Sequence, residues 1–284
     1  MKKPSFKVAS FGKTKYGEKA KKFTLNGAGG VVMEVSDYGG KIIKLFTPDR
    51  MGKMKDIVVG FDSPAGWDNG DPYWGCIIGR YGNRIAKGAF KLNGKKIKLP
   101  ALNNAPAGIG CNLHGGARGW NAYVWDAKPF VKGTDVGVVF THVSPDGDEG
   151  FPGRVEVKVT YTLTAKNVWR VEYEAVPDKD TPINMTQHVY FNFKGEAGGT
   201  IEDHILRSPR RSSRRRTRGR FRPARSFPSK ARRLTSRDRR ASVRRSTRRT
   251  GIWKSAAATT IIGFSTRARW RRVESRRLPS TPAR

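Results

Sequence analysis

The segment Val155–Leu163 reads Val-Glu-Val-Lys-Val-Thr-Tyr-Thr-Leu, so an apolar side chain stands at every second position. Successive side chains of a β-strand point to opposite faces of a sheet, and this period of two therefore predicts a strand with one buried face. Residues 165–167 interrupt the pattern, and residues 168–176 (Val-Trp-Arg-Val-Glu-Tyr-Glu-Ala-Val) resume it. We expect the two segments to form a β-hairpin.

Short runs of the same kind recur along the chain outside this hairpin. They predict strands at Gly30–Val35, Lys41–Phe46, Asp56–Phe61, Ala89–Leu92, Lys96–Leu99 and Val136–Val143. Turn-forming pairs lie between them, at Asn26-Gly27, Asn93-Gly94 and Asp146-Gly147. No stretch of ten or more residues shows the period of an amphipathic helix. The expected fold class is mainly β, with antiparallel strands in a sandwich or barrel.

Charge is distributed very unevenly along the 284 residues. The chain carries 57 Lys and Arg against 23 Asp and Glu, a formal net charge of +34. Of these, 28 basic residues but only 2 acidic ones lie in residues 207–284, a segment rich in Arg, Ser, Thr and Pro. Such a segment has too little apolar surface to offset the entropy of ordering, and we expect it to be disordered. The chain is therefore divided into a β domain, residues 1–206, and an Arg/Ser-rich segment, residues 207–284.

Cysteine content and hydropathy exclude several protein classes. Cys76 and Cys111 are too few for a disulfide framework and lack the spacing of zinc ligands. No run of roughly 18 apolar residues predicts a membrane span. The basic N-terminus is not followed by the apolar stretch of a secretory signal, so we expect a cytoplasmic protein without membrane contact.

Residues suited to chemistry gather in four clusters of the β domain. The clusters are Gly79–Gly88, Asn112–Gly116, Ser144–Gly153 and Thr186–Asn192, and they contain two of the four histidines, His114 and His188. Imidazole exchanges protons near neutral pH, Arg and Asn donate to hydroxyl groups, and aromatic faces cover apolar surface. This combination predicts a site for a neutral, polyhydroxylated small molecule, and no metal site.

The order of these clusters resembles that of the aldose 1-epimerase (galactose mutarotase) family over residues 10–206. Segments before the clusters, Phe11-Gly12, Asp37–Gly40 and Thr47–Arg50, are similar to the opening strands of that family. The resemblance implies a large antiparallel β-sandwich, the galactose mutarotase-like supersandwich, with its C-terminal part missing or scrambled here. It also implies an isomerase that interconverts the α and β anomers of a free aldohexose such as galactose or glucose, with no cofactor.

The resemblance also assigns roles to residues. His188 would be the general acid at the ring oxygen, and His114 would hydrogen-bond the sugar near the same oxygen, which makes the two histidines the expected catalytic pair. Substrate-binding residues would be Asn83 and Arg84 at the ring hydroxyls and Tyr190 in the pocket wall. We expect His142 and His204 to be structural or exposed. We expect a loop role for Asp148 and Glu149.

The match to the family ends abruptly after Leu206. The general base of the family, a glutamate in a Thr-Glu-Pro-Gly-like strand, and a sugar-binding aspartate in a Gly-Tyr-Asp-His-Asn segment are both absent from the sequence. Codons that encode residues 258–266 can be chosen so that a shift of one base yields Gly-Tyr-Asp-His-Asn. We therefore hypothesise that residues 207–284 are an out-of-frame translation and that the chain as printed has impaired activity.

Two alternatives stay open from the sequence. The Arg-rich segment would make the protein a nucleic-acid-binding protein, with a non-catalytic β domain, if that segment is genuine. The β domain would be a catalytically silent sugar-binding module if the missing carboxylates have no substitute.

Overall fold

Strand β13 (Val155–Leu163) has the bounds that its alternating pattern predicts. In the computed structural model, which describes residues 2–205, 212–214, 226–228, 252–253 and 256–263, its side chains at 155, 157 and 159 are buried. It pairs in antiparallel fashion with β12 (Asp135–Ser144) and with β14 (Val168–Pro177), so the predicted hairpin is confirmed.

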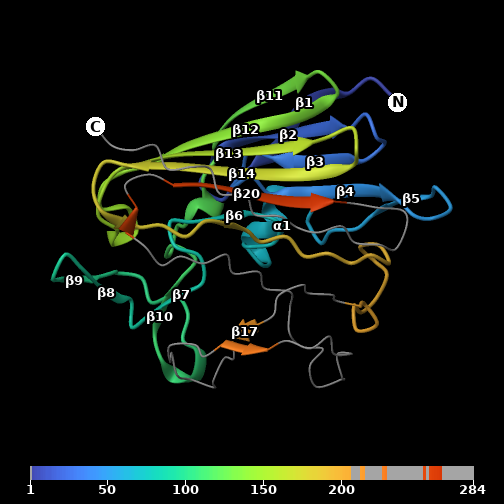
Figure 1. Cartoon of the computed structure of the whole chain (residues 1–284). Coiled ribbons are helices and arrows are strands. Elements are labelled where there is room, and N and C mark those ends of the chain that lie inside the picture. Colours follow the sequence, from blue (N-terminus) through green and yellow to red (C-terminus); the bar gives the residue numbers. More distant parts are fainter. Residues whose placement is uncertain (1, 206–211, 215–225, 229–251, 254–255, 264–284) are drawn as a thin grey trace.

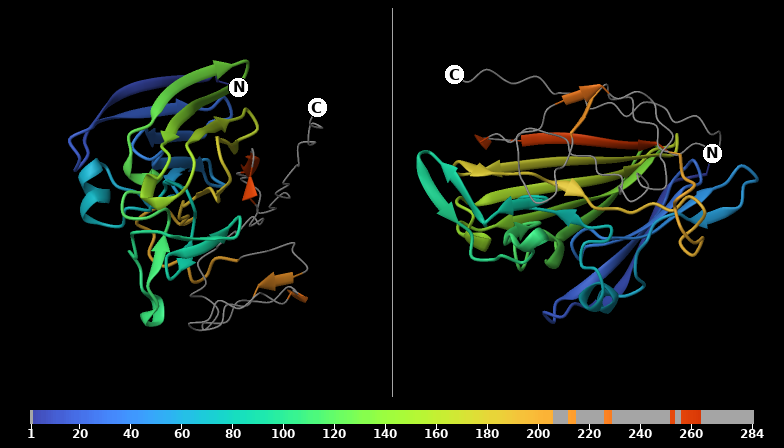
Figure 2. Two further views of the ribbon diagram at one scale, coloured as in Figure 1. Left: turned by 90° about the vertical axis from the view of Figure 1, so that its left-hand side faces the viewer. Right: turned by 90° about the horizontal axis from the view of Figure 1, so that it is seen from below.

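Two five-stranded antiparallel sheets make up the body of the protein (Figure 1). The first has the order of the sequence: β1 (Ser5–Lys13), β2 (Lys19–Asn26), β3 (Val32–Ser36), β4 (Ile42–Pro48) and β5 (Met54–Asp56). The second consists of β11 (Asp126–Lys132), β12, β13, β14 and β20 (Ala256–Gly263). Figure 2 shows the two sheets from two further directions.

The main hydrophobic core lies between these sheets. Buried side chains of the first sheet, such as Phe23 and Met33, belong to the same cluster as Phe140, Val159 and Val171 of the second. The mainly-β sandwich that the sequence predicts is therefore confirmed. Among the described residues, no helix has the length and apolar character needed to cross a membrane.

The other described elements are short. They are α1 (Pro64–Asn69), β6 (Ile77–Ile78), β7 (Arg84–Ala86), β8 (Ala89–Leu92), β9 (Lys95–Lys98), β10 (Cys111–Leu113), β15 (Thr181–Pro182), β16 (Thr186–Gln187), β17 (Ser212–Arg214), β18 (Ser226–Pro228) and β19 (Ile252–Trp253), with 3-10 turns at Pro106–Gly108, Trp120–Ala122 and Asp148–Gly150. The β7–β10 and β6–β16 pairs bring the sequence clusters together.

Local sequence explains where the strand predictions succeed and where they fail. The Asn93-Gly94 pair joins β8 to β9, and both residues have positive φ (49° and 78°), as a tight two-residue hairpin turn requires. The predicted strand Asp56–Phe61 is wrong, because β5 ends at Asp56. The Asp56 carboxylate accepts the N–H groups of Leu45 and Val58, and these bonds turn the chain out of the ladder.

Sixteen residues of the Arg/Ser-rich segment, for which the sequence predicts disorder, belong to the described part of the chain. Its described residues form strands, of which β20 pairs with β14 from Val168↔Gly263 to Ala175↔Ala256. Residues 256–263 (Ala-Ala-Ala-Thr-Thr-Ile-Ile-Gly) carry no charge and include β-branched residues, which suits a strand beside an open edge. The remainder of residues 207–284 lies outside the described residues.

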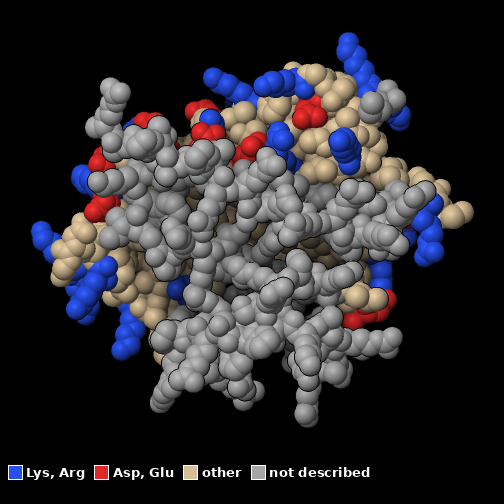
Figure 3. Space-filling model, viewed as in Figure 1, with Lys and Arg blue, Asp and Glu red and all other residues tan. Residues whose placement is uncertain are grey.

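Along the rim of the described part, Asp and Glu lie among Lys and Arg on the face in Figure 3.

Candidate active site

His114 is fixed by a reciprocal pair of hydrogen bonds with Asn83. The β7–β10 ladder sets Arg84 opposite Leu113, so the residues that precede and follow them also meet. The His114 N–H donates to the Asn83 carbonyl oxygen (3.0 Å), and the Asn83 N–H donates to His114 Nδ1 (2.9 Å). Because Nδ1 accepts a hydrogen bond, a neutral His114 carries its proton on Nε2.

His188 lies beside His114 and is positioned by a second pair of strands, β6 and β16. It follows β16, which pairs with β6, and its N–H donates to the carbonyl oxygen of the buried, free cysteine Cys76 (2.9 Å). The imidazole rings of His114 and His188 lie 5.0 Å apart between centroids and are nearly perpendicular, at 88°. The structure therefore brings together the two histidines that the sequence motifs single out.

Aromatic rings surround this imidazole pair. The ring centroid of Tyr190, a predicted pocket residue, lies 5.2 Å from that of His188. The Trp74 ring in turn lies 6.4 Å from the Tyr190 ring between centroids. Tyr73, which sequence reasoning missed, contacts both imidazoles, with ring centroids 4.8 Å from His114 and 6.2 Å from His188. Burial raises the pKa of Tyr73 to about 12, so its hydroxyl stays protonated at neutral pH.

Arg84 lies beside His114 and is oriented by two asparagines. Its Nε donates to Asn104 Oδ1 (2.7 Å), and a terminal nitrogen donates to Asn83 Oδ1 (3.2 Å). All five residues predicted for the sugar site thus lie on this network or in ring contact with it. The guanidinium, two imidazoles, an amide and aromatic faces form a set that suits a small, neutral, polar ligand.

The loop after His114 can be built only with glycine. Gly115 and Gly116 both have positive φ, and a Cβ on Gly115 would lie 2.0 Å from the Gly79 carbonyl oxygen. Glu149 closes the loop from outside, because its carboxylate accepts the N–H groups of Ala117 (2.8 Å) and Arg118 (3.0 Å). The loop role expected for Glu149 agrees with these contacts.

Arg80 makes extensive buried contacts that the sequence analysis did not predict. Its side chain is buried and donates to the carbonyl oxygens of Ser144, Pro145, Phe151, Pro152 and Gly153. Burial lowers its pKa to about 10, which leaves it charged at neutral pH. Its place after the apolar run Cys76–Gly79 was the available signal.

The other two histidines lie outside the imidazole pair. His142 of β12 lies among the rings of Trp120, Tyr123 and Trp125, and burial lowers its pKa to about 4. His204 Nε2 accepts the Phe193 N–H (2.9 Å). Both sets of contacts agree with a structural role. The described residues contain no group of three or more His, Cys, Asp and Glu that could hold a metal ion.

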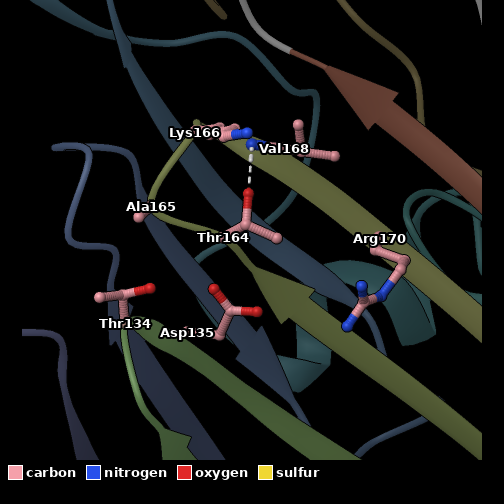
Figure 4. A pocket seen from close by; sticks show the side chains of 7 residues that line it. All are labelled: Thr134, Asp135, Thr164, Ala165, Lys166, Val168 and Arg170. Carbon is pink, nitrogen blue, oxygen red and sulfur yellow. Dashed lines mark hydrogen bonds between the residues drawn. The ribbon is translucent and has the colours of Figure 1, made fainter.

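A pocket of about 380 Å³ lies elsewhere, at the ends of two hairpins (Figure 4). Its lining consists of Thr134, Asp135, Thr164, Ala165, Lys166, Val168 and Arg170. These residues lie at the end of β12–β14 opposite to Ser144, the residue that contacts Arg80. The pocket contains no histidine and none of the predicted site residues, so we do not assign the chemistry to it.

Comparisons with known proteins agree with the motifs. The family model described as aldose 1-epimerase matches residues 21–213. Galactose mutarotase of Bos taurus is 41% identical over 172 residues, which are 61% of this chain and 47% of that protein. Aldose 1-epimerase of Escherichia coli K12 is 34% identical over 190 residues, 67% of this chain and 52% of that protein.

A solved structure resembles the fold. The crystal structure of galactose 1-epimerase from Lactobacillus acidophilus NCFM has a TM-score of 0.60 and 27% sequence identity, and the match covers 70% of this chain and 55% of that chain. The present chain spans about half the length of the curated relatives it matches.

Proposed function

Because the chain belongs to the aldose 1-epimerase family, we propose that its imidazole pair binds a free aldohexose and serves the interconversion of its α and β anomers. The observation that carries the proposal is the 5.0 Å separation of the His114 and His188 rings, with tyrosine rings on both sides. A pyranose placed against these rings meets donors along one edge and aromatic surface along a face.

In the proposed reaction, His188 protonates the ring oxygen while a base removes the proton of the anomeric hydroxyl. The bond between C1 and the ring oxygen breaks, giving the open-chain aldehyde, and rotation about C1–C2 exposes the other face. Closure reverses the transfers, so the acid and base regain their starting states. His114, with its proton on Nε2, donates near the ring oxygen, while Asn83 and Arg84 bind ring hydroxyls.

Sugar binding tests the proposal directly. Galactose and glucose titrated into the full chain should give saturable chemical-shift changes at the imidazoles, measured by NMR. His114→Ala and His188→Ala should each weaken binding about tenfold, since each removes a hydrogen bond and ring contact. His204→Gln serves as the control and should bind as the wild type does. If neither galactose nor glucose binds saturably, the proposed function is refuted.

Turnover should be slow even where binding is normal. The base that the family resemblance implies is a glutamate in a segment that this sequence does not contain, and general acid–base terms are each worth roughly 10²–10⁴ in rate. Polarimetry of α-galactose with purified protein should therefore give a rate close to that of buffer. A rate far above the blank would show that another group supplies the base.

Other parts of the assignment are proposals of the same kind. We assign the protein to the cytoplasm and treat residues 207–284 as out-of-frame, which sequencing the gene across codons 200–215 tests. An unshifted frame there would contradict the second point. The alternative of nucleic-acid binding depends on a segment that lies largely outside the described residues, and the relatives reported above favour the sugar site.

A further inference from the structure

Two neighbouring asparagines, Asn103 and Asn104, form hydrogen bonds with segments that carry residues of the candidate site. Asn103 Oδ1 accepts the Leu113 N–H (2.8 Å), and its Nδ2 donates to the carbonyl oxygens of Leu113 (3.0 Å) and Gly116 (2.8 Å). These two residues bracket His114 in the chain. The Asn103 amide therefore uses its oxygen once and its nitrogen twice to hold the loop that carries the imidazole.

The Asn104 side chain contacts Arg84 and serves as a hydrogen-bond acceptor. Its Oδ1 accepts the Arg84 Nε–H (2.7 Å), and Arg84 donates onward to Asn83 Oδ1. The Asn104 backbone pairs with Cys111, its N–H at 3.3 Å and its carbonyl oxygen at 2.7 Å, which ties this loop to β10. The side chain of Asn104 thus acts toward the site as a hydrogen-bond acceptor.

We propose that Asn103 and Asn104 are positioning residues of the sugar site: Asn103 places His114 and Asn104 orients Arg84. The inference rests on the proposed function. A sugar hydroxyl is recognised only by donors held in place, and neither an imidazole on a glycine loop nor a long guanidinium side chain is rigid by itself. The two amides remove this freedom before a ligand arrives.

The contacts make one chemical change give opposite results at adjacent positions. In Asn103→Asp, the carboxylate loses both donors and faces the Leu113 and Gly116 carbonyl oxygens, so the loop is repelled. In Asn104→Asp, the carboxylate still accepts from Arg84 Nε, and the bond gains the assistance of charge. A general effect of added negative charge, or of a damaged loop, would not separate the two variants.

The experiment measures the dissociation constant for galactose, with folding of each variant checked by circular dichroism. We expect Asn103→Asp to raise the constant about tenfold and Asn104→Leu to raise it similarly, while Asn104→Asp stays within about threefold of the wild type. Asn26→Asp is the matched control, since Asn26 lies in the first sheet and its side chain donates to the Ser5 hydroxyl (3.2 Å). Equal weakening by the two neighbouring Asp variants would overturn the inference.

A second measurement separates this inference from the proposed function. Without sugar, the ¹⁵N signals of the His114 ring report its Nδ1 contact with Asn83, and the Arg84 Nε–H signal reports its contact with Asn104. Asn103→Asp should alter the first and Asn104→Leu the second. If Asn103→Asp does not fold, Asn103→Ala replaces it with the same expectation. Should the wild type bind no sugar, the proposed function fails, and unchanged ring and Nε signals in these variants would independently refute the positioning roles.

Discussion

Replacement of Arg80 by methionine is expected to lower the free energy of unfolding by at least about 4 kcal/mol. Arg80 is 2% exposed, and its two terminal nitrogens donate to five carbonyl oxygens as well as to the hydroxyls of Ser144 and Thr181. A buried acceptor left without its donor costs about 1–3 kcal/mol, and methionine would leave several in that state. Domains of this kind have a total stability of about 5–15 kcal/mol, so the loss is a large fraction.

Urea unfolding followed by circular dichroism measures this effect. Arg80→Lys should fall between wild type and Arg80→Met, because an ammonium has only three hydrogens to offer at one point. Arg154→Met is the control: Arg154 is exposed and forms a surface ion pair with Glu156, which is worth roughly 0–1 kcal/mol. A midpoint for Arg80→Met as high as that of the control would contradict the importance of these contacts.

Replacement of Lys41 by methionine is expected to remove a pH dependence of stability. Lys41 is fully buried, donates to the Asn121 carbonyl oxygen, and has its ammonium 3.4 Å from the centre of the Tyr38 ring. Burial lowers its pKa from 10.5 to about 7. Between these values, the unfolded chain holds the proton and the folded chain does not.

The sign of the effect follows from that difference. Because the unfolded state binds more protons, the contribution of Lys41 to stability rises with pH from about 7 to about 10.5, by on the order of 1.4 kcal/mol per pH unit. Below pH 7 both states carry the charge, and the contribution stays at its lowest value. Methionine carries no charge, so the advantage of Lys41→Met should be largest at pH 6 and shrink toward pH 9.5.

Urea midpoints at pH 6, 7, 8 and 9 for both proteins test this expectation. Subtracting the variant from the wild type cancels the titration of other groups, including the buried tyrosines. Lys158→Met is the control, because Lys158 is a surface residue paired with Glu174. A difference between wild type and Lys41→Met that does not change with pH would contradict a buried, neutral Lys41.

Strand prediction succeeded where one face of a strand is buried and its neighbours are local. β13 and β8 have the predicted bounds because alternation and a tight turn are written in adjacent residues. β1 has no such pattern, since it is exposed along almost its whole length. The end of β5 depends on hydrogen bonds that the Asp56 carboxylate accepts from Leu45 and Val58, and periodicity carries no information about them.

The site was predictable to the extent that its residues belong to motifs. Resemblance singled out Asn83, Arg84, His114, His188 and Tyr190, and the structure brings the two imidazoles into contact. Tyr73, Asn103 and Asn104 were missed because they act through contacts between loops, and their residue types are common at surfaces. Arg80 was missed for a similar reason, because an arginine is usually exposed.

As the gene accumulates mutations, the crowding at Gly115 excludes every substitution that replaces this glycine with another amino acid. Every amino acid that replaces glycine adds a carbon, which would stand 2.0 Å from the Gly79 carbonyl oxygen. Ala117, two residues later and exposed, has no such restriction. Descendants of this gene that keep the imidazole pair must therefore inherit the glycine, whereas its outer neighbour is free to drift.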